Sequence, residues 1–281
     1  MKFLIQTINN QIVHDFSFTL LEAIRYQNWK TNSNDFTYIL TNETFESLPK
    51  DIPIEIDGKK DIKYSEYLKD YCPIGSVEFV CNFYKYVYGE EFIPKPINVP
   101  ECLFDFANRN IKNVTITDNV LNLDDFGTRE NAIFIKSNDK IKWENNGMDN
   151  KLGFINDREA YPVGNYQISD MTDIDAEYRC FVYKDELVGI HYYSGNFTVF
   201  PDYEQILKMK RAFSYLMGQA PVAYTLDIGV KWKEGGNETF VIECHDFYSC
   251  GLYGFSDLNK LPFMFNRWHL EHINKVKNKL S

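Results

Sequence analysis

The chain has 281 residues, of which 44% are hydrophobic and 25% charged, a balance typical of a globular protein and not of a disordered one. Its formal net charge of −10 disfavours nucleic-acid binding, which needs a basic surface, although a local basic cleft for an anionic ligand stays open. The six cysteines form no C-x-x-C pair, and neither a signal peptide nor a membrane span is evident, so we expect a reduced, cytoplasmic protein.

The first residues of the chain predict the start of an α/β lobe. LIQT (4–7) and Asp35–Thr41 have strand character, and Phe18–Trp29 between them has helical periodicity. Phe18 and Trp29 lie at the edge of the helix's apolar stripe. The stripe itself is formed by Leu20, Leu21 and Ile24.

A second helix and a proline-rich segment complete this lobe. The turn Cys72–Ser76 leads into the helix VEFVCNFYKYVYG, with Ser76 as its N-cap and Gly89 as its stop. The segment EEFIPKPINVPE contains three prolines, which are incompatible with a helix interior. We therefore expect a linker that ends the lobe near residue 100, giving an N-terminal domain of residues 1–100 and a second domain of residues 101–281.

Strands dominate the second domain, with two helices near its end. A Lys184-Asp185 turn predicts one hairpin, and Gly235-Gly236 predicts another. The mixture predicts an α+β fold with a substantial antiparallel sheet. The expected strands cover 112–118, 131–139, 165–170, 176–183, 186–193, 223–230 and 238–245, and the expected helices 202–217 and 256–278.

A lysine precedes a polar, glycine-containing run in Asn131–Asp149. Lys136 lies at the end of a strand, and Ser137–Gly147 follows with Lys140 and Lys142. Ammonium groups and backbone N–H groups in such a loop suit a polyphosphate ligand. The alternative is a solvated hairpin with exposed lysines.

A carboxylate and a guanidinium share one face of the strand EYRCFVY. Glu177 and Arg179 are two residues apart and project together, whereas Tyr178, Cys180 and Val182 face the other side. A guanidinium there can bind phosphate or carboxylate through two hydrogen bonds. The alternative is an exposed ion pair that contributes little to stability.

Two carboxylates occur inside apolar strands. Asp227 lies in YTLDIGV and Glu243 in FVIECHD, and burial of unpaired carboxylates is costly. Oxygen ligands on neighbouring strands suit Mg²⁺ held together with nucleotide phosphates. The alternative is that both carboxylates pair with Lys or Arg.

The order of these features resembles the ATP-grasp superfamily, and in particular the bacterial and phage ATP-grasp proteins. The resemblance covers residue 107 to the C-terminus: a strand lysine, a glycine-containing loop, an E-x-R hairpin, a helix, an aspartate strand, and E-x-x-D with the G-L-Y-G tail (251–254). It implies an ATP-grasp fold, in which two α+β subdomains clasp ATP, preceded here by the smaller N-terminal α/β lobe.

The resemblance also implies roles for individual residues. Arg179 and Lys142 are the expected catalytic groups, with Arg179 meeting the transferred phosphate. Asp227, Glu243 and His245 are the expected metal ligands, for Mg²⁺ or alternatively Mn²⁺. The expected nucleotide-binding residues are Lys136, Lys142, Glu177, Arg109 and the hinge Gln167, Ile168, Ser169 and Asp170.

One residue departs from the family pattern, because His245 replaces the usual asparagine of E-x-N and offers Mg²⁺ a nitrogen instead of an oxygen. The resemblance implies an ATP-dependent ligase that joins a carboxylate to an amine, or to a thiol, through an acyl phosphate, with a peptide or an amino acid as substrate. The alternative is a nucleotide-binding module with little turnover, for which His245 is the only sequence indication. A ligase or kinase acting on nucleic-acid ends is disfavoured by the net charge.

Overall fold

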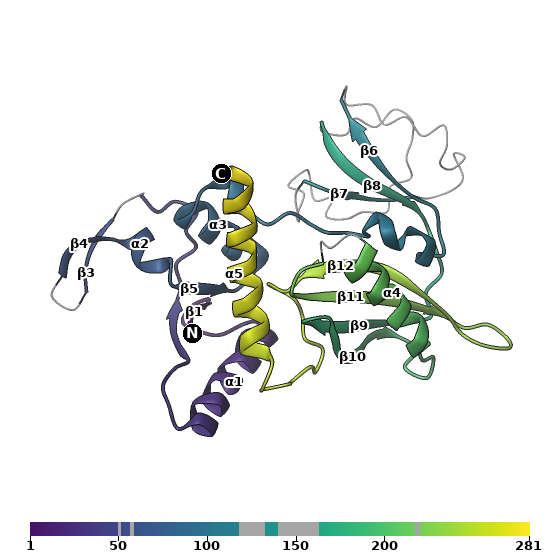
Figure 1. The fold of residues 1–281 in the computed structure, drawn as a ribbon, viewed down its shortest axis with the longest axis horizontal. Coiled ribbons are helices and arrows are strands. Elements are labelled where there is room, and N and C mark those ends of the chain that lie inside the picture. The colour runs from purple at the N-terminus through teal and green to yellow at the C-terminus, as the bar shows by residue number, and fades with distance from the viewer. Residues whose placement is uncertain (50–51, 57–58, 118–132, 140–162, 217–219) are drawn as a thin grey trace. The chain divides into compact units, whose positions relative to one another are not determined.

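The computed structural model describes residues 1–49, 52–56, 59–117, 133–139, 163–216 and 220–281 (Figure 1). The chain forms two compact units. Unit 1 consists of residues 1–94 and 247–281, and unit 2 of residues 95–246. The division expected at residue 100 leaves residues 247–281 in the second domain, whereas their contacts group them with the first ninety-four residues.

Unit 1 contains a parallel sheet of order β2-β1-β5, formed by β1 (Lys2–Gln6), β2 (Thr37–Thr41) and β5 (Tyr71–Ile74). The strand β5 replaces the first part of the turn expected at Cys72–Ser76, so that prediction was wrong there. Pro73 is tolerated in the strand because β5 lies at the edge of the sheet, where a missing backbone N–H can face away from the ladder.

The first and third helices of unit 1 start within three residues of the expected positions. In α3 (Val77–Val87) the Ser76 hydroxyl accepts a hydrogen bond of 3.2 Å from the Phe79 N–H, which confirms the N-cap. In α1 (Asp15–Thr31) the stripe of Leu20, Leu21 and Ile24 is buried. The C-terminal helix α5 (Leu261–Leu280) begins later than expected, with Pro262 in its first turn.

Three small elements and one short turn of helix of unit 1 were not expected from the sequence. They are the strands β3 (Pro53–Ile56) and β4 (Lys59–Lys63), which pair antiparallel, the helix α2 (Tyr64–Leu68), and the 3₁₀ helix η1 (Glu90–Phe92).

Unit 2 begins with a small antiparallel sheet of order β6-β8-β7. Its strands are β6 (Ile111–Ile116), β7 (Ile133–Ser137) and β8 (Gly164–Asp170), so β8 is central and pairs on both sides. One face of the sheet is covered by its own small core of Ile116, Ile133, Ile135, Tyr166 and Ile168.

The larger sheet of unit 2 has the order β10-β9-β11-β12 and is antiparallel throughout, as the sequence predicts. Its strands are β9 (Ala176–Tyr183), β10 (Glu186–Gly195), β11 (Ala223–Lys231) and β12 (Glu238–Asp246). Helix α4 (Tyr203–Leu216) lies across one face (Figure 1), and the 3₁₀ helix η2 (Glu101–Phe106) packs beside it.

Alternation along β9 sorts its residues as expected. Tyr178, Cys180 and Val182 point into the core below α4, where they meet Ile206 and Met209. Residues 177, 179 and 181 therefore face the opposite side of the sheet. That opposite face carries the charged residues.

The two expected hairpin turns are confirmed. Lys184 and Asp185 have φ angles of 49° and 62°, the left-handed pair that a two-residue type I′ turn requires. Lys210 of α4 donates a hydrogen bond of 2.6 Å to the Asp185 carboxylate and so holds this turn against the helix. Gly235 and Gly236, with φ of 92° and 146°, form the turn between β11 and β12.

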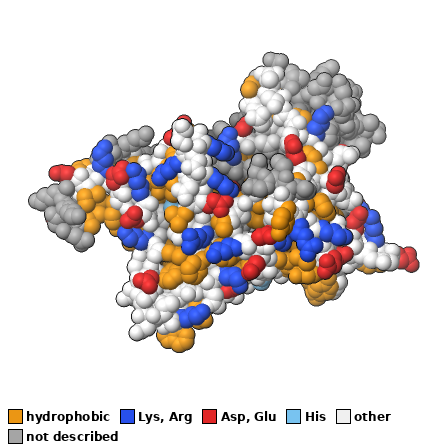
Figure 2. All heavy atoms as spheres, viewed as in Figure 1, with side chains coloured by type: hydrophobic (Ala, Val, Ile, Leu, Met, Phe, Trp, Pro, Cys, Tyr) orange, Lys and Arg blue, Asp and Glu red, His pale blue; other side chains and the backbone are white. Residues whose placement is uncertain are grey.

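Among the described residues, no helix combines the length and apolar character needed to cross a membrane. The face shown in Figure 2 carries acidic and basic side chains intermixed with hydrophobic ones.

Candidate functional site

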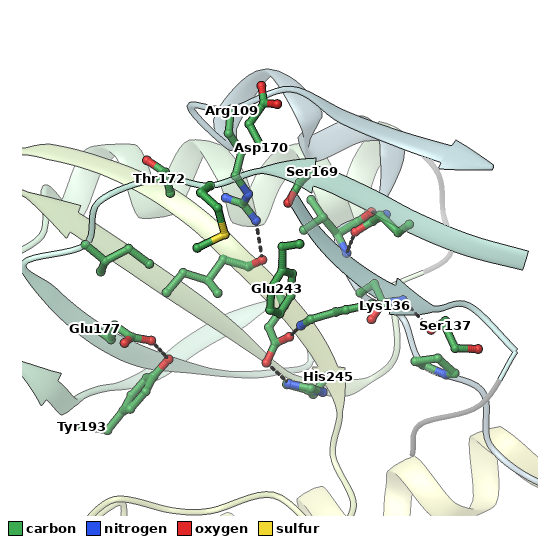
Figure 3. Close-up of a pocket in the computed structure, with 18 residues that line it drawn as sticks. Arg109, Lys136, Ser137, Ser169, Asp170, Thr172, Glu177, Tyr193, Glu243 and His245 are labelled. Carbon is green, nitrogen blue, oxygen red and sulfur yellow. Dashed lines mark hydrogen bonds and ion pairs between the residues drawn. The ribbon is translucent and has the colours of Figure 1, made fainter. Parts of the chain in front are cut away.

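Unit 2 contains a pocket of about 370 Å³ between its two sheets (Figure 3). The small sheet contributes β7 and the end of β8, and the large sheet contributes β9, β10 and β12. Lys136, Glu177, Glu243 and His245, which the sequence predicts as site residues, all line this pocket together with Arg109.

A row of charged residues crosses the large sheet. Arg179 on β9 lies directly opposite Asp227 on β11, and Asp227 lies directly opposite Glu243 on β12. Because residues directly opposite one another share a face, the three side chains occupy the side of the sheet away from α4. The strand order thus brings together residues that are 64 positions apart at most in the sequence.

The first pair in this row is a buried, two-pronged ion pair. Arg179 Nε donates to Asp227 Oδ1 at 2.8 Å, and Nη2 donates to Oδ2 at 2.7 Å. The side chains of Arg179 and Asp227 are only 9% and 2% exposed. Arg179 is therefore a buried residue that binds Asp227, and not the exposed member of a surface ion pair, which is the alternative that the sequence leaves open.

Glu177 contacts a different residue of the pocket. The Tyr193 hydroxyl donates a hydrogen bond of 2.7 Å to Glu177 Oε2, and burial, followed by the nearby Asp227 charge, raises the pKa of Tyr193. The guanidinium of Arg179 also lies 5.8 Å from the centre of the Tyr193 ring, within cation–π range. Tyr193 therefore links the two charged residues of β9.

Glu243 is bound on both of its oxygens. Lys136, reaching over from β7, forms an ion pair with Oε2, and His245 Nε2 lies 2.5 Å from Oε1. Figure 3 shows both side chains converging on the Glu243 carboxylate. This contact joins the small sheet to the large one across the pocket.

Burial changes the titration of both partners of Glu243. It lowers the pKa of Lys136 to about 8, an effect that the Asp227 charge opposes and the Arg109 charge reinforces. It lowers the pKa of His245 to about 4, with Lys136 and Arg179 acting in the same direction. At pH 7, Lys136 is therefore mostly charged and His245 is neutral, so its imidazole is able to ligate a metal ion.

The three expected metal ligands form a cluster. One ligand atom from each of Asp227, Glu243 and His245 lies within 4.8 Å of the other two. Two carboxylates and a neutral imidazole fit a divalent cation, with the nitrogen favouring Mn²⁺ over Mg²⁺. In the structure these carboxylates are neutralised by Arg179 and Lys136, which is the alternative that the sequence leaves open.

The expected hinge lies within the central strand of the small sheet. Ile168 is buried in its core, and the Gln167 side chain exchanges hydrogen bonds of 3.0 and 2.9 Å with the backbone of Val99. Ser169 and Asp170 line the pocket. Strand β8 stays paired with β7 as far as Asp170, so these residues belong to the sheet and not to an irregular hinge. The irregular stretch that leaves the sheet is residues 171–174, of which Met171, Thr172 and Ile174 also line the pocket.

Arg109 lines the pocket with its guanidinium directed at the backbone of β12. It donates to the Val241 and Ile242 carbonyl oxygens at 2.8 and 3.0 Å, and to the Ala107 carbonyl oxygen at 3.0 Å. Its expected contact with phosphate stays a prediction. Lys142 and most of the loop Ser137–Gly147 lie outside the described residues.

Sequence reasoning missed a connection made by the proline-rich segment. Asn98 accepts a backbone hydrogen bond of 2.7 Å from the Cys244 N–H, and its side chain donates to the Ser137 carbonyl oxygen at 2.9 Å. Asn98 therefore links β12 to the end of β7. The only sequence signal is the three-residue segment Ile97–Val99 between two prolines, which is too short to be assigned to a sheet.

Comparisons with known proteins give one family and several distant folds. The family model described as ATP-grasp domain, R2K clade family 2, matches residues 106–261 of this sequence. Among solved structures, D-alanine–D-alanine ligase from Bacillus anthracis has a TM-score of 0.48 and 10% identity, with 100% of this chain and 98% of that chain covered.

Two further structures match at a similar level. A RimK domain ATP-grasp protein from Sphaerobacter thermophilus has a TM-score of 0.47 and 10% identity, covering 97% of this chain and 99% of that chain. A RiPP-associated ATP-grasp ligase from Chryseobacterium gregarium, in complex with ADP and a leader and core peptide, has a TM-score of 0.40 and 12% identity, covering 98% and 97%. No curated protein gives a significant match.

Proposed function

Because the chain belongs to the R2K clade family 2 of ATP-grasp domains, we propose that it is an ATP-dependent ligase that joins a carboxylate to an amine through an acyl phosphate. The observation that carries this proposal is the pocket between two sheets that Lys136, Glu243 and His245 line, with the buried Asp227 carboxylate within 4.8 Å of the ligand atoms of Glu243 and His245. A cation for phosphates and a ligand set for a divalent ion are the two requirements of phosphoryl transfer.

Lys136 is the proposed phosphate-binding residue. It is charged at pH 7, mostly buried, and able to exchange its ion pair with Glu243 for one with a phosphoryl oxygen. We propose that adenine binds next to residues 171–174, whose backbone follows the end of the paired strand β8. Met171, Thr172 and Ile174 line the pocket, as does Glu177. Backbone groups in such a stretch offer both a donor and an acceptor to the base.

Asp227, Glu243 and His245 are the proposed metal ligands. A bound Mg²⁺ or Mn²⁺ would neutralise charge on the phosphates that develops during transfer. The protein's own part is to hold these ligands in place. Arg179 does this for Asp227 through its two-pronged pair, and we assign it this orienting role in addition to the phosphate contact expected from the sequence.

The proposed reaction has two steps. A carboxylate oxygen attacks the γ-phosphorus of ATP, the bond to the bridging oxygen breaks, and ADP leaves, producing an acyl phosphate. The amine nitrogen then attacks the carbonyl carbon, inorganic phosphate leaves with the bonding electrons, and the nitrogen loses a proton. A thiol in place of the amine would give a thioester by the same sequence, and we propose a peptide or an amino acid as the carboxylate substrate.

A second candidate is a nucleotide-binding module without turnover. It is favoured by His245, which takes the place of an oxygen ligand and forms a short contact with Glu243. A histidine held by Glu243 would weaken the affinity for Mg²⁺ and slow phosphoryl transfer without preventing ATP from binding.

An assay for ADP formation distinguishes the two. The purified protein is incubated with ATP, with Mg²⁺ or Mn²⁺, and with pooled amino acids or peptides, and ADP is measured with and without each pool. The ligase proposal predicts ADP release that depends on a pool and on the metal, and that is lost in Asp227→Asn. ATP binding by calorimetry without ADP in any pool would establish the module instead.

A further inference from the structure

The alternation of side chains between the two faces of the large sheet is interrupted in β12 at Ile242. Val241 pairs with Ile228 and Glu243 pairs with Asp227, so Ile242 is an extra residue, a β-bulge. In a regular strand, residues two apart share a face. Here Val241 is fully buried in the core below α4, whereas Glu243 lines the pocket on the other side. The bulge is therefore what directs Glu243 into the site.

The guanidinium of Arg109 binds this bulge. It donates to the carbonyl oxygens of Val241 and Ile242 at 2.8 and 3.0 Å, and a third hydrogen bond of 3.0 Å joins it to the Ala107 carbonyl oxygen. Burial lowers the pKa of Arg109 only to about 10, so it stays charged at pH 7. Charged donors form the stronger hydrogen bonds, and carbonyls at a bulge lie outside the regular ladder.

We propose that Arg109 is a positioning residue, which orients the side chain of the proposed metal ligand Glu243. This role replaces the phosphate contact that the sequence resemblance implies. Its two terminal nitrogen atoms bind consecutive carbonyl groups of β12 and so hold the bulge in place. The bulge in turn determines to which face of the sheet the side chains after Ile242 point. His245, two residues beyond Glu243, keeps the same phase and lies opposite Thr225. Without the guanidinium, the Glu243 carboxylate and the His245 imidazole lose their common orientation toward Asp227.

The inference rests on the proposed metal site, and it differs from a phosphate contact in what it predicts. A phosphate contact would contribute to nucleotide binding even without a metal ion. A positioning residue acts on the metal ligands and leaves metal-free nucleotide binding unchanged.

The test measures metal and nucleotide binding separately in Arg109→Lys and Arg109→Met. Mn²⁺ affinity is titrated by electron paramagnetic resonance in the presence of ADP, and ADP affinity by calorimetry in the presence of EDTA. Lysine keeps the positive charge but cannot span two carbonyl groups.

We expect both variants to lose about tenfold or more in Mn²⁺ affinity, as for other groups that orient metal ligands, and to bind metal-free ADP within about twofold of the parent. Arg211→Met, the same change at an exposed position of α4, is the matched control and should alter neither affinity.

The other outcomes are each informative. Loss of metal-free ADP binding in both variants would make Arg109 a phosphate contact and overturn the inference. Folded variants that bind Mn²⁺ like the parent would reduce Arg109 to a structural residue, which also overturns it. A parent protein that binds no Mn²⁺ with ADP would overturn the proposed metal site itself, and the inference with it. If Arg109→Met does not fold, the lysine variant, which keeps the buried charge, decides.

Discussion

At the scale of single residues, the pair of Arg179 and Asp227 has the clearest energetic consequence. Both side chains are nearly buried and form two hydrogen bonds to each other, so removing one leaves an uncompensated charge in the sheet. We expect Arg179→Met to lower the free energy of unfolding by roughly 3–5 kcal/mol, measured by urea denaturation. The double variant Arg179→Met/Asp227→Leu should recover much of this loss, because no unpaired charge remains. A double variant as unstable as the single one would show that the charge is solvated in the folded protein.

A second prediction at the residue scale concerns Lys136, whose ammonium group has two partners, Glu243 and the phosphate of the proposed complex. In the structure it neutralises Glu243, and in the proposed complex it binds phosphate. We expect Lys136→Met to weaken ATP binding by roughly ten- to a hundredfold, the equivalent of one charge-assisted hydrogen bond. The same variant should bind Mn²⁺ more tightly in the absence of nucleotide, because the competing cation is gone. Lys208→Met, at an exposed position of α4, serves as the control. Unchanged ATP affinity in calorimetry would remove Lys136 from the nucleotide site.

At the scale of elements, the strands of the large sheet depend on one close cross-strand contact. Gly229 on β11 lies opposite Phe240 on β12, and a methyl group at position 229 would come within 2.5 Å of the Phe240 ring. The ring is fully buried and has little room to move. Gly229→Ala should therefore cost about 1–3 kcal/mol of stability through overpacking, measured by urea denaturation.

A second variant tests the cause of that loss. In Gly229→Ala/Phe240→Leu the smaller side chain makes room for the methyl group, so the double variant should be more stable than the sum of the two single changes predicts. Simple additivity would indicate that the glycine is needed for its backbone and not for the space above it.

At the scale of the whole molecule, unit 1 is built from both ends of the chain. His269 of α5 and Tyr84 of α3 share a buried hydrogen bond of 2.7 Å, which joins residues from the two ends of the sequence. Burial, together with the smaller effect of neighbouring His272, lowers the pKa of His269 to about 3. His269 is therefore neutral in the folded protein, whereas the unfolded chain binds a proton near pH 6.5.

This difference in pKa predicts a loss of stability in acid. Between pH 6.5 and pH 3 the unfolded state binds more protons at this residue, so stability falls as the pH falls, by roughly 2 kcal/mol between pH 6.5 and pH 5. The variant His269→Gln, which can still bond to Tyr84, should show a smaller decrease over that interval in urea denaturation, since carboxylates titrate alike in both proteins. Equal decreases in the two proteins would show that His269 is accessible to protons in the folded state.

The sequence by itself determined most of the elements of this protein and the kinds of residue at its site. Alternation in EYRCFVY separates the residues facing the core from Glu177 and Arg179, and the Lys184-Asp185 and Gly235-Gly236 turns define the hairpins. Charges inside apolar strands marked Asp227 and Glu243 as residues that need partners, and the expected ATP-grasp fold is confirmed by the family match. These features are local, because periodicity, turn geometry and the cost of burying a charge depend on neighbouring residues.

Only the tertiary structure decided which residues meet. Strand order makes Asp227 the partner of Arg179 and brings Lys136 from another sheet to Glu243. The bulge at Ile242 reverses the alternation that Val241 and Glu243 would otherwise follow, and Pro73 is accepted in a strand because that strand lies at an edge. Each of these features depends on the register and pairing of strands that are distant in the sequence. A shift of one residue in that register would move every side chain of a strand to the other face of the sheet.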